Sequence, residues 1–175
     1  MLTHIVLVGM MGAGKTTVGN ALAQRRKWPF VDSDAQVEER AGRSVAEIWK
    51  ADGEEGFRAL ESTALAEALA LEWPAVIAAA GGTVLDPANR RRLRSHRPVV
   101  WLRAEPATLA ARLGDGAGRP LLGADPPGAM KALAVEREPL YAEVADIVID
   151  VDGLEPADVI TAAEAALDNE GHSLP

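Results

Sequence analysis

The sequence predicts an α/β protein in which a five-stranded parallel sheet carries helices on both faces. Five short apolar segments are separated by stretches with helical periodicity, and this alternation is typical of parallel sheets. The first segment, residues 5–8, is an unbroken and mostly β-branched run, as expected for a strand buried on both faces. In such sheets the crossovers are right-handed and ligands bind outside the carboxyl ends of the strands.

A glycine-rich loop directly follows the first predicted strand. Residues 9–17 read Gly-Met-Met-Gly-Ala-Gly-Lys-Thr-Thr, which matches the phosphate-binding loop at every fixed position. Glycines let backbone N–H groups turn inward around phosphate oxygens, Lys15 brings positive charge, and the Thr16 hydroxyl can ligate Mg²⁺. Apolar residues at helical spacing follow, so the loop opens a helix whose N-terminus favours anions. We therefore expect a nucleoside triphosphate site rather than a chance glycine-rich turn.

Residues that start and stop helices divide the chain between the first and third strands. Gly42 is typical of a position just past the end of a helix. Ser44 and Glu47 have the spacing of a capping box, which starts a helix near residue 45, and Pro74 stops the last helix of this part. The predicted elements are a strand at residues 28–31 and helices at residues 35–41, 45–52 and 54–72.

The second half of the chain repeats the alternation. Asp86 and Pro87 fit the N-cap and first position of a helix whose arginine-rich face we expect to be solvated. Residues 114–128 contain five glycines, three prolines and few apolar residues, which predicts a mobile loop long enough to have a function. We expect Pro139 to follow the end of a helix. The predicted elements are strands at residues 75–79, 99–102 and 147–149, and helices from 87, at 105–113, at 131–137 and from 156.

The composition restricts the compartment and the partners. The 175 residues contain no cysteine, so thiolate metal sites are not available and a reducing compartment is natural. The net charge of −8 argues against nucleic acid or an anionic membrane as partner, and no apolar stretch approaches the roughly 20 residues of a membrane span. No secretory signal pattern precedes the first strand. We expect a monomeric, cytoplasmic protein of one domain, residues 1–175 with its core at about 3–168, acting on small molecules.

Several motifs, taken in order, resemble those of the shikimate kinase family, small P-loop kinases of the nucleoside-monophosphate-kinase type. They are residues 9–17, Asp32-Ser33-Asp34, Gly56-Phe57-Arg58, Gly81-Gly82, Arg119-Pro120-Leu121-Leu122 and Arg137-Glu138-Pro139-Leu140-Tyr141. The resemblance covers the chain from residue 5 to about 167. It implies a three-layer P-loop kinase fold with a substrate-binding region at about 33–61 and a mobile lid at about 112–127. The implied reaction transfers the γ-phosphate of ATP to the 3-hydroxyl of shikimate, on the way to chorismate and the aromatic amino acids.

On the nucleotide side, the resemblance implies a phosphate cradle, a magnesium site and a mobile arginine. Arg119 is implied to neutralise charge on the transferring phosphoryl group. Thr16 would ligate Mg²⁺ directly and Asp32 through water, which suits an ion that dehydrates reluctantly. Arg112 and the turn at residues 151–156 would flank the adenine. The implied ATP-binding residues are Gly12, Ala13, Gly14, Lys15, Thr16, Thr17, Arg112 and Arg119, and the implied catalytic residues are Lys15, Asp34 and Arg119.

On the substrate side, the resemblance implies that Asp34 contacts the reacting hydroxyl, either as a base or as an orienting acceptor. Arg58 and Arg137 are implied to grip the substrate carboxylate, which a planar guanidinium matches bidentately. Gly81 and Gly82 would let the backbone approach the substrate ring. These residues would form the shikimate site.

Three of these residues also have a local interpretation. Asp34 suits a helix N-cap, Arg58 has glutamates four positions before it and three after it, and Arg137 lies between two glutamates. Ala80 stands where the family usually has the first of three glycines. An alanine is harmless there if φ is negative and costly if φ is positive.

Two other functions fit parts of the same pattern. A gluconate or nucleoside-monophosphate kinase would share the scaffold, and gluconate would also suit the two arginines and the aspartate. A nucleotide-dependent switch would use the phosphate loop, but the Asp-x-x-Gly segments at residues 125–128 and 150–153 come too late in the chain for a GTPase. The order of the motifs favours shikimate.

Overall fold

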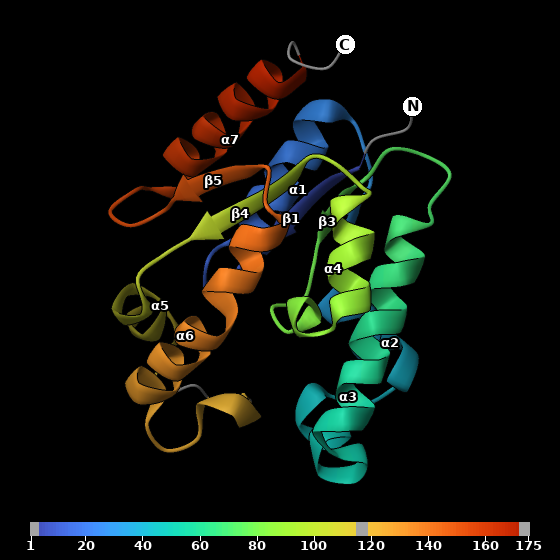
Figure 1. Cartoon of the computed structure of the whole chain (residues 1–175), viewed down its shortest axis with the longest axis vertical. Helices are drawn as coiled ribbons and strands as arrows, with labels where there is room; N and C mark the ends of the chain where they lie inside the picture. The colour runs from blue at the N-terminus through green and yellow to red at the C-terminus, as the bar shows by residue number, and fades with distance from the viewer. Residues whose placement is uncertain (1–3, 115–118, 172–175) are drawn as a thin grey trace.

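The computed structural model describes residues 4–114 and 119–171 (Figure 1). Its sheet has the strand order β2-β3-β1-β4-β5, and every neighbouring pair is parallel. The predicted α/β class and the five-stranded parallel sheet are therefore confirmed. The strands are β1 (Ile5–Val8), β2 (Phe30–Asp32), β3 (Val76–Ala78), β4 (Val99–Arg103) and β5 (Ile147–Asp150).

The helices lie on both faces of this sheet. They are α1 (Lys15–Arg26), α2 (Ser33–Ala41), α3 (Val45–Leu69), α4 (Pro87–Arg94), α5 (Pro106–Leu113), α6 (Pro126–Val144) and α7 (Pro156–Gly171), with short 3₁₀ helices η1 (Thr83–Leu85) and η2 (Pro120–Leu122). The chain runs from β1 through α1 to one edge of the sheet, and from β3 through α4 back across β1 to β4. Right-handed crossovers in opposite directions place α1 and α4 on opposite faces. Helix α1 packs with α7, whereas α4 packs with α3 and α6 (Figure 1).

The apolar side chains form two separate cores. The larger core contains the inner strands and includes Leu65 and Leu69 of α3. A small second core joins α2 to the first half of α3 through Val37, Ile48 and Phe57. The region that the sequence analysis assigns to substrate binding thus has packing of its own, beside the main sheet. In the described part of the chain, no helix is long and apolar enough to cross a membrane.

Helix α3 consists of two helical segments that meet at a kink, at the position where the sequence predicts a break. Gly53 has φ 69° and ψ −174°, so it interrupts the helical backbone. The predicted capping box is present, because Ser44 N–H donates to Glu47 Oε2 at 2.8 Å and Glu47 N–H donates to Ser44 Oγ at 3.3 Å. The helix ends at Leu69, three residues earlier than predicted.

Helix α6 begins earlier than the sequence analysis predicts. Pro126 takes the first helical position, and Asp125 caps the helix by accepting from Gly128 N–H at 3.1 Å. The end of the predicted loop at 114–128 is therefore helical, and η2 forms a further turn within it. Residues 115–118 of that loop, which fall in the predicted lid, lie outside the described residues.

Pro139 does not follow the end of a helix, as predicted, but lies inside α6. A proline has no N–H and removes one helical hydrogen bond, here to the carbonyl of Val135. Val135 is 80% exposed, so water can reach that carbonyl. The helix continues to Val144 and carries Arg137 and Tyr141 on one element.

The basic face of α4 is only partly solvated, so the expectation is wrong for Arg90. Its Nη1 donates to the carbonyls of Val84 and Leu85 at 2.8 and 3.2 Å, and its Nε lies 2.8 Å from Glu143 Oε2. Arg90 therefore connects η1, which directly follows Gly81 and Gly82 in the chain, to α6.

Candidate active site

The carboxyl ends of the strands open into a cavity of about 490 Å³. The phosphate loop, the start of α2, helix α3, the loop after β3, the segment before η2 and helix α6 all contribute side chains or backbone to it. The residues predicted for the site that line this cavity are Lys15, Thr16, Asp32, Asp34, Arg58, Gly81, Gly82, Arg119 and Arg137. The structure thus brings together residues that are more than 100 positions apart in the chain.

The phosphate loop presents an uncapped helix end to this region. Gly14 is the N-cap of α1 at φ 96° and makes no side-chain cap, so the first N–H groups of the helix are available for an anion. Lys15 Nζ donates to the carbonyls of Gly9 and Met10 at 2.8 and 3.1 Å. Burial lowers the pKa of Lys15, an effect that the negative charge of the nearby aspartates opposes.

A second cavity, of about 360 Å³, lies on the other side of the same loop. Arg112 donates to the carbonyls of Gly12 and Val151 at 3.2 and 3.3 Å, which joins α5 to the phosphate loop and to the turn after β5. The structure therefore brings together Arg112 and the turn that the sequence analysis placed beside the adenine. The predicted ATP-binding residues that line this second cavity are Gly12, Ala13, Gly14, Thr17 and Arg112.

Asp32 connects the phosphate loop to α2. Its Oδ2 accepts from Thr16 Oγ1 at 2.8 Å, and its Oδ1 accepts from Asp34 N–H at 3.1 Å. Asp32 is thus the N-cap of α2, and the alternative interpretation of Asp34 as a cap is wrong. The hydroxyl of Thr16 and the carboxylate of Asp32 form a pair of oxygen ligands of the kind that Mg²⁺ prefers.

Asp34 lies in the first turn of α2, and its side chain is free of the capping role. Burial raises the pKa of Asp34, and the positive charge of Lys15 opposes that rise. A carboxylate with a raised pKa accepts a proton more readily than an ordinary aspartate. Asp34 is therefore suited to contact a hydroxyl in the cavity.

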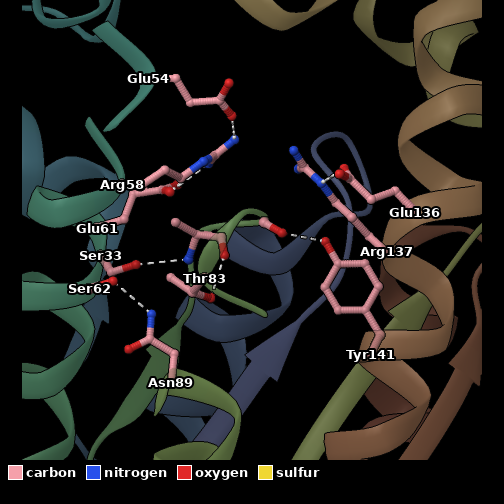
Figure 2. A network of polar contacts seen from close by, with 12 residues as sticks. Ser33, Glu54, Arg58, Glu61, Ser62, Thr83, Asn89, Glu136, Arg137 and Tyr141 are labelled. Carbon is pink, nitrogen blue, oxygen red and sulfur yellow. Dashed lines mark hydrogen bonds and ion pairs between the residues drawn. The ribbon is translucent and has the colours of Figure 1, made fainter. Parts of the chain in front are cut away.

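Arg58 lies in the second half of α3 and points toward the loop after β3 (Figure 2). Its Nη1 donates to Glu61 Oε2 at 2.6 Å and its Nη2 donates to Glu54 Oε1 at 3.2 Å, so the local ion pairs expected from the spacing do form. The guanidinium also lies 5.5 Å from the ring of Phe57 and 5.9 Å from that of Trp49. These contacts hold Arg58 in place at the wall of the cavity.

Arg137 reaches the cavity from the opposite side, on α6 (Figure 2). Its side chain is only 2% exposed, and its nearest carboxylate, that of Glu136, is 3.5 Å from Nε. Nε has no hydrogen-bond partner. A buried cation with so little compensation is costly unless an anion completes its surroundings. Arg58 and Arg137 therefore face one cavity from two helices, and an anionic group between them would be favoured.

Gly81 and Gly82 pack closely against the side chains of Arg137 and Arg58, respectively. A Cβ at Gly81 would lie 3.4 Å from the Gly9 carbonyl oxygen, and a Cβ at Gly82 would overlap the guanidinium of Arg58. Ala80, in contrast, is buried without a positive φ, and its N–H donates to Ser33 Oγ at 2.8 Å. The alanine is therefore accommodated without backbone strain.

Gly82→Ala is expected to raise the KM for the carboxylate-bearing substrate by about tenfold to a hundredfold, the value of a lost charged hydrogen bond. Gly82 has φ −87°, so the alanine backbone is unstrained and the effect comes from displacement of Arg58. Gly81→Ala, whose Cβ would make contacts of 3.4 Å, should have a clearly smaller effect. Steady-state kinetics of both variants would test this, and an equal KM in the two would contradict it.

Glu61 is the buried partner of Arg58. Its side chain is 4% exposed, and burial raises the pKa of Glu61 from 4.5 to about 7, although the positive charge of Arg58 opposes the rise. Since the pKa is higher in the folded than in the unfolded chain, Glu61 stabilises the fold most below pH 4.5. This contribution is lost as the pH rises to about 7.

Glu61→Gln is expected to remove this pH dependence. At about 1.36 kcal/mol per pKa unit, the free energy of unfolding of the glutamine variant, relative to the unmodified protein, should rise by about 2–3 kcal/mol between pH 5 and pH 8. Denaturant unfolding at the two pH values measures this difference. Glu55→Gln, at an exposed position of the same helix, is the matched control. A relative stability that stays constant with pH for Glu61→Gln would contradict the assignment.

Sequence reasoning missed three residues of the cavity region. Trp49 was assigned no role in the site, yet it lines the cavity and contacts Arg58. Glu38 lines it one turn after Asp34, and that i,i+4 spacing on one helix is a signal the sequence offered. Glu61 was considered only as an ion-pair partner, because no local pattern indicates that its carboxylate is buried.

A phosphate loop beside a cavity that is lined by Asp34 and by arginines from two helices, one of them almost fully buried, defines a P-loop kinase that acts on a small molecule. The shikimate kinase family model matches residues 11–168. The chain is 48% identical over 171 residues to a shikimate kinase of Symbiobacterium thermophilum, covering 96% of this chain and 98% of that protein. It is also 48% identical over 164 residues to one of Moorella thermoacetica, covering 94% of both. The chain belongs to the shikimate kinase family.

Solved structures agree with this assignment. A shikimate kinase from Acinetobacter baumannii in complex with shikimate superposes with a TM-score of 0.90 at 34% identity, covering 97% of this chain and 95% of that one. A gluconokinase from Sinorhizobium meliloti has a TM-score of 0.66 at 23% identity, covering 98% and 95%. The latter shows the shared fold alone, so the resemblance noted in the sequence is confirmed for the shikimate kinases.

Proposed function

We propose that the protein transfers the γ-phosphate of ATP to the 3-hydroxyl of shikimate, giving shikimate 3-phosphate and ADP. The observation that carries this proposal is the pair of arginines on α3 and α6, which line one cavity together with Asp34 and Lys15 of the phosphate loop. Membership of the shikimate kinase family supports the same substrate. The product would serve chorismate and aromatic amino acid synthesis.

On the nucleotide side, residues 12–17 would surround the ATP phosphates with backbone N–H groups, and the ammonium of Lys15 would leave the Gly9 and Met10 carbonyls to reach them. Arg112 and the turn after β5 would hold the adenine in the second cavity. Thr16 would hold Mg²⁺ directly and Asp32 through water, as their oxygen pair allows. When bound, the ion neutralises charge on the β- and γ-phosphates.

On the shikimate side, the guanidinium groups of Arg58 and Arg137 would bind the carboxylate, and Gly81 and Gly82 would let the ring lie against the backbone. Asp34 would accept a hydrogen bond from the 3-hydroxyl and thereby aim its oxygen at the γ-phosphorus. As the new P–O bond forms and the bond to ADP breaks, the hydroxyl proton leaves toward Asp34. Arg119, at the rim of the cavity, would stabilise the charge on the transferring group.

The remaining properties follow from the chemistry of the chain. The net charge of −8 disfavours nucleic acid and anionic membranes as partners, so the arginines would act on small anions only. The absence of cysteine suits the reducing environment of the cytoplasm, where ATP is available, and we propose that the protein acts there as a monomer.

ADP release by the purified protein with Mg²⁺-ATP tests the proposal. Shikimate, gluconate and nucleoside monophosphates are supplied in parallel, and the product is identified by mass spectrometry. We expect strong release with shikimate alone. Release with gluconate or a nucleotide instead would keep the kinase class and overturn the substrate. No stimulation by any of them would overturn the kinase assignment.

A further inference from the structure

Tyr141 is the only tyrosine of the chain and is completely buried. Its ring lies 5.7 Å from that of Trp101, against the sheet. Its hydroxyl donates to the carbonyl oxygen of Gly81 at 2.7 Å, across 60 residues of sequence (Figure 2). Burial raises the pKa of Tyr141, so the phenol keeps its proton and serves as a hydrogen-bond donor.

This hydrogen bond joins two parts of the substrate side of the cavity. Tyr141 lies four positions after Arg137 on α6, so the two side chains project from the same face of the helix toward the glycine loop (Figure 2). A Cβ at Gly81 would lie 3.7 Å from Arg137 Nη1 and 3.4 Å from the Tyr141 hydroxyl. The Gly81 backbone therefore lies close to both the hydroxyl of Tyr141 and the guanidinium of Arg137.

The other hydrogen bonds of this loop do not provide that link. Thr83 N–H and Oγ1 donate to the Ala80 carbonyl at 3.1 and 2.7 Å, within the loop, and Ala80 N–H donates to α2. Among the hydrogen bonds of the described residues, the bond from the Tyr141 hydroxyl is the one that reaches this loop from α6. On the other side, Gly81 packs against the Gly9 carbonyl, which also accepts from Lys15.

We propose that Tyr141 is a positioning residue for the acceptor substrate. Through its hydrogen bond to the Gly81 carbonyl, it fixes the position of the glycine backbone relative to Arg137. This inference rests on the proposed function. Without the hydroxyl, the ring still fills its site, but the Gly81 carbonyl loses its donor and the loop can shift relative to α6. Binding of shikimate should weaken, whereas ATP, held by the other side of the phosphate loop, should bind as before.

Tyr141→Phe is expected to raise the KM for shikimate about five- to tenfold, the value of one hydrogen bond, and to leave the KM for ATP and kcat within about twofold. Thr83→Val is the matched control, because it removes a buried 2.7 Å hydroxyl-to-carbonyl bond in the same loop that does not reach α6. It should lower the melting temperature without moving the shikimate KM. An unchanged shikimate KM in Tyr141→Phe, or an equal rise in Thr83→Val, would overturn the inference.

Because Tyr141 is unique, growth with 3-fluorotyrosine labels this site alone and keeps the hydroxyl. The single ¹⁹F resonance should shift when shikimate is added, and this readout holds even if Tyr141→Phe fails to fold. A resonance that does not move with shikimate would overturn the inference. If the unmodified protein does not phosphorylate shikimate, the proposed function itself fails. If it does, but the ¹⁹F resonance does not move and the shikimate KM of Tyr141→Phe is unchanged, only the role of Tyr141 is refuted.

Discussion

Lys15→Met is expected to lower kcat about a thousandfold, roughly 4 kcal/mol of transition-state stabilisation. Charge builds up on the transferring phosphoryl group, and a preorganised cation in a site with little water stabilises it far more than it stabilises the ground state. Lys15 stands at the first position of α1, from which its ammonium would move off the Gly9 and Met10 carbonyls to reach the phosphates. Methionine keeps the length of the side chain and removes the charge.

The measurement is the steady-state rate of ADP release, with the melting temperature recorded for each variant. Lys131→Met is the matched control, since Lys131 is exposed on α6 and does not line the cavity beside the phosphate loop. It should retain the full rate. A Lys15→Met variant that folds and keeps more than a tenth of the rate would refute the role assigned to this residue.

The parts of the site that the sequence predicted well depend on local patterns. The phosphate loop requires two glycines, a lysine and a threonine or serine at fixed spacing, so it can be read from eight consecutive residues. The strands were predicted because β-branched runs bounded by turn residues have few alternative structures. The alternative interpretation of Asp34 as the cap of α2 is wrong, because two aspartates flank the serine and only the backbone shows which of them lies outside the helix.

The parts that failed depend on contacts between distant segments. Pro139 was expected to lie beyond a helix, but whether a proline ends a helix depends on whether water reaches the freed carbonyl, which burial decides. Local sequence gives no sign that Glu61 is buried beneath Arg58 or that Tyr141 reaches Gly81. The conformation of Ala80 is likewise set by the loop's bonds to Ser33 and Thr83. The sequence therefore predicts which residues meet at the cavity better than it predicts how they are held.

Asp34→Asn is expected to lower kcat by about a hundred- to a thousandfold, within the range found for loss of a general base. Asparagine has the same shape and one acceptor oxygen, so it can still orient a hydroxyl but cannot take its proton. Shikimate binding, which we propose to depend mainly on the two arginines, should change only a fewfold. Glu39→Gln, on the exposed side of α2, is the matched control and should keep the full rate.

The pH dependence of the rate separates a base from an orienting acceptor. Burial raises the pKa of Asp34, so the unmodified enzyme should lose activity as the pH falls through that raised pKa, because the protonated acid cannot accept the hydroxyl proton. Asp34→Asn should be slow at every pH and should lack this acidic limb. If Asp34→Asn keeps most of kcat, positioning alone accounts for catalysis at this residue. If its rate still falls at low pH as that of the unmodified enzyme does, another group titrates there, and the assignment of Asp34 as the base is wrong.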